Sequence, residues 1–413
     1  MRISRTKALA VAGASLAALL VIAGCGSSAA PAATTAPAKA AATTAPAAPA
    51  ATTGAAAPAA AGKAIAIKVG LIAPLTGDVK TFGESTKNGF DIAIEEANRA
   101  GKVNITTVAG DDKNDATEGV NVATKLINQD KVKAIVGSVS SKVSIPISEV
   151  TQSAKILQIT STSTNEKVTV DGGKRKDYVF RVCFIDPFQG QVMAKFALND
   201  LKFKTAAVMY DNANDYSKGL AQVFKDSFEK GGGKVVNFES YSTADVDFSA
   251  SLTKIASGKP EFLYLADYYN KVNLIAKQAR EKGVTAVFGG GDGWDSSDLD
   301  RKAVEGGYYS NHYSPDSTTP EVQNWVKKYQ EKYKSVPDAL ATLGYDATIL
   351  LVNAIVTAGS DDPTKIRDAM AATKDFKAVS GTLSIDKDGN PVKSAVVIQV
   401  KGGKDVYSAT VAP

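Results

Sequence analysis

Short strand-like runs and longer amphipathic runs alternate along most of this chain, and this alternation constrains its fold more than any other feature. The first series comprises predicted strands at residues 65–73, 103–109, 132–137 and 156–160, with predicted helices at residues 80–100, 116–129 and 143–154. Strands of about four to eight residues separated by such helices indicate βαβ units. These units build a parallel sheet with helices on both faces.

The alternation begins again in the second half of the chain. Predicted strands at residues 205–210, 235–241, 262–266 and 286–289 are separated by predicted helices at residues 216–230, 248–256 and 271–282. The chain after residue 62 has about 350 residues. This length exceeds the size at which a single hydrophobic core usually divides into two domains. The sequence therefore predicts an α/β fold with two Rossmann-like lobes, each a parallel sheet flanked by helices.

The last hundred residues break the alternation. Three helices are predicted in succession, at residues 320–333, 339–358 and 363–372. The Asp-Gly dipeptide in the segment from Asp386 to Asn390 favours a hairpin turn, so we expect residues 379–385 to pair with residues 395–400. Asp386 and Asp388 lack the ligand spacing and distal Glu of a calcium loop, and we expect no metal there.

The first 25 residues have the pattern of a secretory signal. Basic residues precede an apolar run at residues 8–22, and small residues follow it. That run is roughly 15 residues long, too short for a span that needs about 20. The residues before Cys25 resemble the bacterial lipobox, which implies a signal peptide at residues 1–24 and a lipidated Cys25. We therefore expect an extracytoplasmic protein held to the cell membrane by lipid.

Residues 25–64 join this anchor to the folded part. The tract is built almost entirely of Ala, Pro and Thr, which bury too little apolar surface to offset the entropy of ordering. We interpret it as a flexible tether with a mean span of about 35 Å. With Cys25 lipidated, Cys183 has no partner for a disulfide, and its apolar surroundings favour a small buried side chain over a reactive thiol.

The composition argues against several classes of function. The net charge is +5 and the basic residues are scattered, so we expect no nucleic-acid partner. The chain has one histidine, His312, and it has no Gly-x-Ser-x-Gly elbow and no phosphate-binding loop. Gly289-Gly-Gly-Asp-Gly293 does not have the spacing of a dinucleotide fingerprint. We expect no enzyme, no cofactor and no metal; a secreted hydrolase that uses His312 is the rival hypothesis.

Polar residues follow the predicted strands where an open α/β sheet binds its ligands, at the carboxyl ends. Ser138-Val-Ser-Ser141 precedes a helix whose positive end would suit a carboxylate, although Ser140 or Ser141 could simply cap that helix. Five hydroxylated residues, Thr160-Ser-Thr-Ser-Thr164, end the next strand. In the second half, Tyr264-Leu-Ala-Asp-Tyr-Tyr269 and Asp292 supply aromatic and acidic groups. Hydroxyls on one lobe and an acid on the other would bind a zwitterion.

These features, with several short motifs, resemble the substrate-binding proteins of branched-chain amino acid ABC transporters, which are type I periplasmic binding proteins. The resemblance covers essentially all of residues 66–400. The motifs that carry it are Val69-Gly-Leu-Ile-Ala-Pro-Leu-Thr-Gly77, Gly83-x4-Asn88-Gly89, Asp111-Asp112, Val136-Gly-Ser-Val-Ser-Ser141, Arg181-x4-Asp186-x2-Gln189-Gly190, Asp215-Tyr-Ser-Lys-Gly219 and Tyr268-Tyr269.

The resemblance implies two lobes joined by three crossover strands. The first lobe is expected at residues 65–183 and 311–392, the second at residues 186–308 and 395–413, and the hinge at residues 183–186, 308–310 and 392–394. It also implies a membrane permease with ATPase subunits as partners, and we expect a monomer. The lobes would rotate about the hinge to close over a bound amino acid. A module of the same fold that reports ligand to a receptor is an open alternative.

On the first lobe, the resemblance implies that Ser141 gives its hydroxyl and amide to the ligand carboxylate. Thr164 resembles the family threonine that holds the α-carboxylate and amino group. The ammonium would also meet the backbone carbonyl of Thr162 or Ser163, and Phe82 would flank the ligand side chain.

On the second lobe, Tyr216 and Tyr268 resemble the tyrosines that close over the ligand. Asp292 stands where the family usually has a glutamate for the ammonium, and it is one methylene shorter. The family's Pro-Gly-Ala is Ser161-Thr162-Ser163 here. Because relatives bind aromatic acids, amides or urea, the cargo stays open between a branched-chain amino acid and these solutes.

Overall fold

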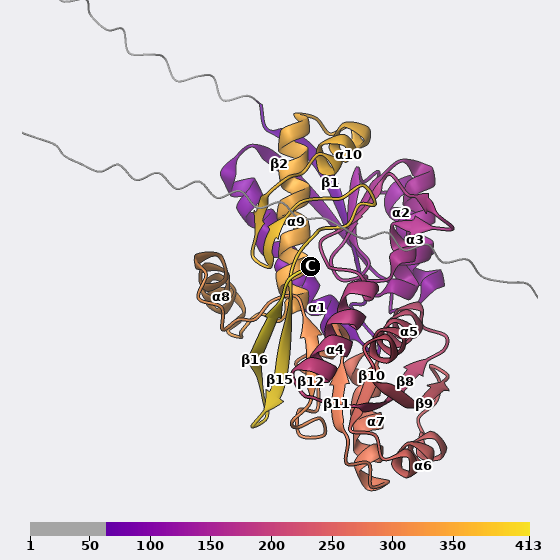
Figure 1. Cartoon of the computed structure of the whole chain (residues 1–413). Helices are drawn as coiled ribbons and strands as arrows, with labels where there is room; N and C mark the ends of the chain where they lie inside the picture. Colours follow the sequence, from indigo (N-terminus) through magenta and orange to yellow (C-terminus); the bar gives the residue numbers. More distant parts are fainter. Residues whose placement is uncertain (1–62) are drawn as a thin grey trace, which may run out of the picture. The chain divides into compact units, whose positions relative to one another are not determined.

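The computed structural model describes residues 63–413, and its strands form two large sheets (Figure 1). The first sheet has five parallel strands in the order β2-β1-β3-β4-β7. Their bounds are β1 Ile65–Ala73, β2 Val103–Asp111, β3 Ala134–Gly137, β4 Leu157–Thr160 and β7 Val179–Arg181. The predicted signal peptide, Cys25 and nearly all of the predicted tether lie outside the described residues.

The second sheet has seven strands in the order β16-β15-β12-β11-β10-β8-β9. The strands from β12 to β9 are parallel, and β15 and β16 run antiparallel at one edge. Their bounds are β8 Thr205–Asp211, β9 Lys234–Tyr241, β10 Phe262–Ala266, β11 Val287–Gly290, β12 Tyr308–Asn311, β15 Ala395–Lys401 and β16 Lys404–Val411.

Helices accompany both sheets, as the alternation predicted. Those associated with the first sheet are α1 Lys80–Ala100, α2 Ala116–Asn128, α3 Ser141–Ala154, α8 Pro320–Tyr333, α9 Ala339–Ala358 and α10 Pro363–Ala371. Those associated with the second sheet are α4 Asp186–Asn199, α5 Asp215–Lys230, α6 Ser249–Gly258 and α7 Tyr269–Glu281. The predicted α/β fold class is confirmed.

Helix α9 is long and apolar enough to cross a membrane by length and composition, but it is a core helix of the first sheet. Its most apolar window is 78% buried inside the protein. Leu343 and Leu350 of α9 pack in one cluster with Val69 and Leu71 of β1. Figure 1 shows the orange α9 beside the indigo β1, although far more than two hundred residues separate them in the chain.

Helix α4 was not predicted, because its pattern is not that of an amphipathic helix. Buried residues lie on most of its faces, since the helix packs between the second sheet and α5. Because buried positions include polar residues such as Asp186 and Gln189, the apolar residues of the helix do not repeat with a clear 3.6-residue period. Its start is clear in retrospect, because Pro187 occupies the first turn, where a missing N–H costs nothing.

The predicted pairing of residues 379–385 with residues 395–400 is wrong. Strand β14 (Gly381–Leu383) pairs with β13 (Phe376–Ala378), and β15 pairs with β12 and β16. The turn itself does form: the Asp386 carboxylate accepts hydrogen bonds from the backbone of Asp388 and Asn390, at 2.9 and 2.8 Å. Beyond the turn, the two flanking segments pair only through an isolated bridge between Ile385 and Pro391. Proline has no N–H group, so it cannot extend this bridge into a hydrogen-bonded ladder. The edge of β12 offers β15 a longer partner.

We call each large sheet with its associated helices a unit, the first built on the first sheet and the second on the second sheet. The chain passes between the two units three times. The crossings are residues 182–185, residues 312–319 and residues 384–394, which follow β7, β12 and β14 respectively. Residues 308–310, which the sequence analysis placed in the hinge, lie inside β12 and pair with β11 and β15. The second crossing therefore begins only after Asn311.

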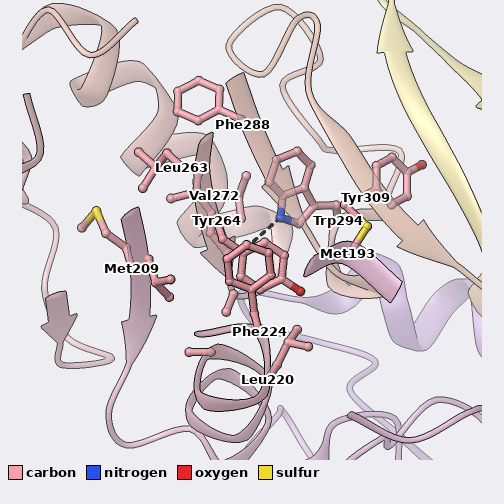
Figure 2. Packing of buried hydrophobic residues seen from close by; sticks show 14 of the residues in the cluster. Met193, Met209, Leu220, Phe224, Leu263, Tyr264, Val272, Phe288, Trp294 and Tyr309 are labelled. Atoms are coloured by element: carbon pink, nitrogen blue, oxygen red, sulfur yellow. Dashed lines mark hydrogen bonds between the residues drawn. The ribbon is translucent and has the colours of Figure 1, made fainter. Parts of the chain in front are cut away.

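Trp294 anchors the loop that follows β11 in the core of the second unit. Its indole is fully buried, and Nε1 donates to the Leu265 carbonyl at 3.2 Å. Figure 2 shows the ring among Phe288, Tyr309 and Met193. A β-carbon on Gly290 would lie 2.1 Å from this indole, so any residue other than glycine at this position would clash with the ring.

We predict that Gly290→Ala destabilises the protein, because the new methyl group would force the Trp294 indole out of a close-packed core. Overpacking of this kind costs about 1–3 kcal/mol, which corresponds to a drop of roughly 2–4 °C in Tm for each kcal/mol. Differential scanning calorimetry measures it. Gly70→Ala is the matched control, since a β-carbon there meets the flexible end of Leu126 at 3.0 Å and has no closer neighbour. Equal Tm values for the two variants would contradict the prediction.

Candidate functional site

Five of the eight residues predicted for the ligand site line one small cavity. They are Phe82 in α1, Thr162 after β4, Tyr216 in α5, Tyr268 at the N-cap of α7 and Asp292 in the 3-10 turn η2 (Asp292–Trp294). Val139, Gly293 and Leu340 complete the wall. The cavity volume is about 20 Å³, which is room for about one water molecule.

The cavity lies where the carboxyl ends of strands from both sheets face each other. Thr162 follows β4 of the first sheet, and Tyr268 and Asp292 follow β10 and β11 of the second. Open parallel sheets place their ligand-binding loops at this edge. Two units that were predicted separately from the alternation pattern therefore contribute to a single site.

Aromatic rings join the two units at the cavity. The Phe82 ring packs edge-on against Tyr268 and Tyr269, with centroids 5.5 and 5.1 Å apart. Tyr216 and Tyr268 stack on each other at 5.0 Å. The Thr81 hydroxyl donates to the Tyr269 hydroxyl at 2.8 Å. These contacts hold the walls of the cavity close together.

Asp292 is the acidic group of the cavity, and both of its carboxylate oxygens have hydrogen-bond partners. The Tyr216 hydroxyl donates to Oδ1 at 3.0 Å, and Nε2 of His312 lies 3.0 Å from Oδ2. The same Tyr216 hydroxyl accepts the backbone N–H of Gly293 at 3.2 Å. A buried carboxylate is thus held in one orientation from two sides.

The other three predicted residues, Ser141, Ser163 and Thr164, are buried and do not line this cavity. The Ser141 hydroxyl accepts the backbone N–H of Asn165 at 3.2 Å, and the Ser163 hydroxyl donates to Ser144 at 2.6 Å. Within the described residues, Thr164 Oγ1 has no hydrogen-bond partner. They belong to the hydroxyl-rich loops next to the cavity wall.

The Ser163 carbonyl, one of the two expected for the ammonium, already has hydrogen-bond partners within the protein. That carbonyl accepts Nη1 of Arg181 at 2.8 Å and the Cys183 thiol at 3.4 Å, which uses both of its lone pairs. The expectation for Cys183 is confirmed: the side chain is fully buried, and burial raises the pKa of its thiol to about 12.

The N-terminus of α3 has no side-chain cap, contrary to the simple capping interpretation of its serines. Ser140 is the N-cap residue, but its hydroxyl donates to Asn114 Oδ1 at 2.6 Å and bonds no N–H group of the helix. The first-turn N–H groups of α3 therefore keep the partial positive charge that attracts an anion.

His312 and Gln189 contact the cavity residue Asp292, a role that the sequence did not indicate. His312 was weighed only as a hydrolase residue, yet it holds Asp292 and its ring stacks on Phe184 at 3.8 Å. Gln189 Oε1 accepts the Ser310 hydroxyl at 3.1 Å and approaches the backbone N–H of Asp292 at 3.4 Å.

The family model named Periplasmic binding protein matches residues 66–405. The chain belongs to the periplasmic binding protein family. It falls among the type I, branched-chain amino acid members, whose role is to bind a solute for an ABC transporter and not to catalyse a reaction. The fold agrees with this assignment.

Three relatives illustrate the similarity. The leucine-, isoleucine-, valine-, threonine- and alanine-binding protein of Pseudomonas aeruginosa is 31% identical over 79% of this chain and 87% of that protein. The crystal structure of leucine-binding LivK from Thermotoga maritima is 38% identical, with a TM-score of 0.80, and covers 84% of this chain and 99% of LivK. LivJ of Streptococcus pneumoniae, solved with isoleucine, is 30% identical, with a TM-score of 0.78, and the match covers 84% of this chain and 100% of LivJ.

Four buried carboxyl groups close to the site share one electrostatic property. Burial raises the pKa of Asp112 to about 6 and the pKa values of Asp186, Asp267 and Asp295 to about 7. Burial acts in the opposite direction on His312 and lowers the pKa of its imidazole to about 4, although Asp292 partly opposes the shift. Each shift disfavours the charged form of its group.

We predict that the protein is more stable at about pH 5.5 than at about pH 8. In this interval the folded chain keeps protons on the four buried acids that an unfolded chain has released. The free energy of unfolding therefore falls as pH rises toward 7. His312 and Lys393, whose pKa values burial lowers to about 4 and about 8, act with the opposite sign and offset part of this fall. Thermal unfolding across this range measures the slope, and a Tm that rises with pH would contradict it. Asp267→Asn removes one titrating group and should flatten the curve.

Proposed function

We propose that this protein binds an amino acid with a hydrophobic side chain between its two lobes and delivers it to a membrane permease. The observation that carries the proposal is the position of Asp292: a buried carboxylate in the wall of a cavity lined mainly by aromatic and aliphatic side chains. Such a wall suits a ligand that has one cationic group and an apolar body.

The ammonium group of the ligand is assigned to Asp292. A carboxylate has about four acceptor positions, and Tyr216 and His312 occupy two of them. The remaining positions can accept N–H groups of an ammonium, in charge-assisted bonds that are about twice as strong as neutral ones. The carbonyl of Thr162 stays a candidate for a further ammonium contact.

The carboxylate group of the ligand is assigned to the hydroxyl-rich loops of the first lobe. The uncapped N-terminus of α3 begins at Ser141, and Thr164 Oγ1 is a buried hydroxyl without a partner among the described residues. Free N–H groups and a free hydroxyl are donors that an anion can accept from. Ser163 supports this loop through its bond to Ser144.

The side chain of the ligand is assigned to the apolar part of the wall, which consists of Phe82, Val139 and Leu340. This matches relatives whose names specify leucine or isoleucine. A relative from Rhodopseudomonas palustris, 26% identical and with a TM-score of 0.76, was solved with benzoate. Benzoate has no ammonium, so in this chain it would face Asp292 without a counter-charge. Asp292 therefore favours an amino acid over an aromatic acid.

Binding requires the lobes to separate, because the cavity holds only about one water volume. The contacts that must break include those of Thr81 with Tyr269 and of the Asn165 side chain with the Asp215 carbonyl, 2.9 Å apart. We place the first lobe at residues 65–183 and 312–392 and the second at residues 186–311 and 395–413, because β12 pairs within the second sheet through Asn311. The hinge then comprises the three crossings near residues 183–186, 312 and 392–394. Ligand favours closure because only the closed form contacts it from both sides.

The protein is extracytoplasmic, as the solute-binding proteins of ABC importers are. We propose that lipid on Cys25 anchors it to the membrane and that residues 25–64 let it reach the permease. We also propose that it acts as a monomer.

Isothermal titration calorimetry with L-leucine, L-isoleucine, L-valine and benzoate tests the proposal. We expect the wild-type chain to bind at least one of the amino acids, and Asp292→Asn to weaken its affinity about 10–100-fold, because an ion pair is lost. Asp298→Asn is the matched control, an exposed acid a few residues away in the same loop. Wild-type affinity in Asp292→Asn, or binding of benzoate alone, would refute the assignment.

A further inference from the structure

We propose that His312 is a positioning residue for the ligand site: its imidazole fixes the orientation of the Asp292 carboxylate and ties that carboxylate to the hinge. The inference rests on the proposed function, since it explains how the ammonium-binding group is held. It adds a residue that neither the motifs nor the family resemblance pointed to.

The contact is short and shielded from water. Nε2 of His312 lies 3.0 Å from Asp292 Oδ2, and the side chains are 1% and 9% exposed. Tyr216 donates to the other oxygen of the same carboxylate. A carboxyl group held on one oxygen could still rotate about its terminal bond. Bonds on both oxygens remove that freedom before a ligand arrives.

His312 orients Asp292 without neutralising it. Burial lowers the pKa of the imidazole, Lys393 from the third crossing lowers it further, and together they outweigh Asp292 from η2, which raises it. The imidazole is therefore neutral at pH 7. Because Nε2 must carry a hydrogen to donate to the carboxylate, Nδ1 is the unprotonated nitrogen. A neutral donor leaves the negative charge of Asp292 available to the ligand ammonium, whereas a lysine or arginine here would compete for it.

The location of His312 connects the site with the crossings. It is the first residue after β12, where the chain leaves the second sheet. Its ring stacks on Phe184, which lies in the first crossing. A rotation of the lobes about these segments therefore takes place next to the imidazole that bonds Asp292. The orientation of Asp292 is consequently coupled to the hinge through one hydrogen bond.

The same geometry argues against the rival hydrolase hypothesis. A catalytic histidine needs a nucleophile within hydrogen-bond reach of its second nitrogen. Within residues 63–413, Nδ1 of His312 has no hydrogen-bond partner. The residue has an acid on one side and no serine or cysteine bonded on the other.

A pair of variants tests the positioning role by leucine calorimetry. His312→Leu fills a similar volume without a donor, and we expect it to weaken binding about tenfold. His312→Gln keeps an amide N–H near the position of Nε2, and its affinity should stay within about threefold of wild type. In an Asp292→Asn background, His312→Leu should add little, because both changes remove the same interaction. Equal losses in the Gln and Leu variants would indicate a packing role and overturn the proposal.

Because His312 is the only histidine in the chain, ¹⁵N NMR of the wild-type protein reports on it without any ligand. We expect the neutral Nε2–H tautomer at pH 7 and no titration above about pH 5, with an altered signal in Asp292→Asn. An imidazole that titrates near its ordinary pKa of 6.5, or that carries its hydrogen on Nδ1, would overturn the proposal.

The two experiments separate this inference from the proposed function. A wild-type chain that binds no amino acid refutes the proposed function, whatever the NMR shows. A wild-type chain that binds leucine with unchanged affinity in His312→Leu refutes the positioning role alone.

Discussion

A carboxylate taken out of water is costly unless other groups replace its hydration, and the arrangement around Asp292 meets that requirement. The hydroxyl of Tyr216 and the imidazole of His312 replace two hydration contacts at 3.0 Å each. Trp294, two residues further on, fixes the turn in the core of the second unit. Tyrosine, histidine and tryptophan come from three separate segments, so the position of one acid depends on the packing of the whole second unit.

The remaining features of the site follow from the meeting of two sheets. Parallel strands that end at facing edges bring the hydroxyl-rich loops of one unit toward the acidic and aromatic loops of the other. Phe82 packs against Tyr268 and Tyr269 across the boundary, and the cavity that remains has about the volume of a water molecule. These apolar contacts and a ligand would compete for the same surfaces. That competition would allow the two lobes to be either closed on each other or separated to admit a ligand.

The sequence analysis predicted the elements of the fold well and their long-range partners poorly. Strands such as β10 (Phe262–Ala266) and helices such as α9 were predicted correctly because the pattern of apolar residues that marks them lies within one continuous segment of the chain. The pairing of β15 was predicted wrongly, because a turn signal at Asp386 is local whereas the edge of β12 lies far away in sequence. In the site, the family resemblance supplied Phe82, Tyr216 and Asp292, and it did not reveal that Arg181 already occupies the Ser163 carbonyl.

By itself the sequence determined the α/β class, the two series of βαβ units and the polar strand ends, because periodicity and turn chemistry are properties of short segments. Only the tertiary structure decided that His312 holds Asp292, that β15 pairs with β12 and β16, and that Ser141 and Thr164 lie beside the cavity and not in its wall. Those outcomes depend on which groups, many residues apart, compete for the same hydrogen bonds and the same buried space. No local pattern encodes the result of that competition.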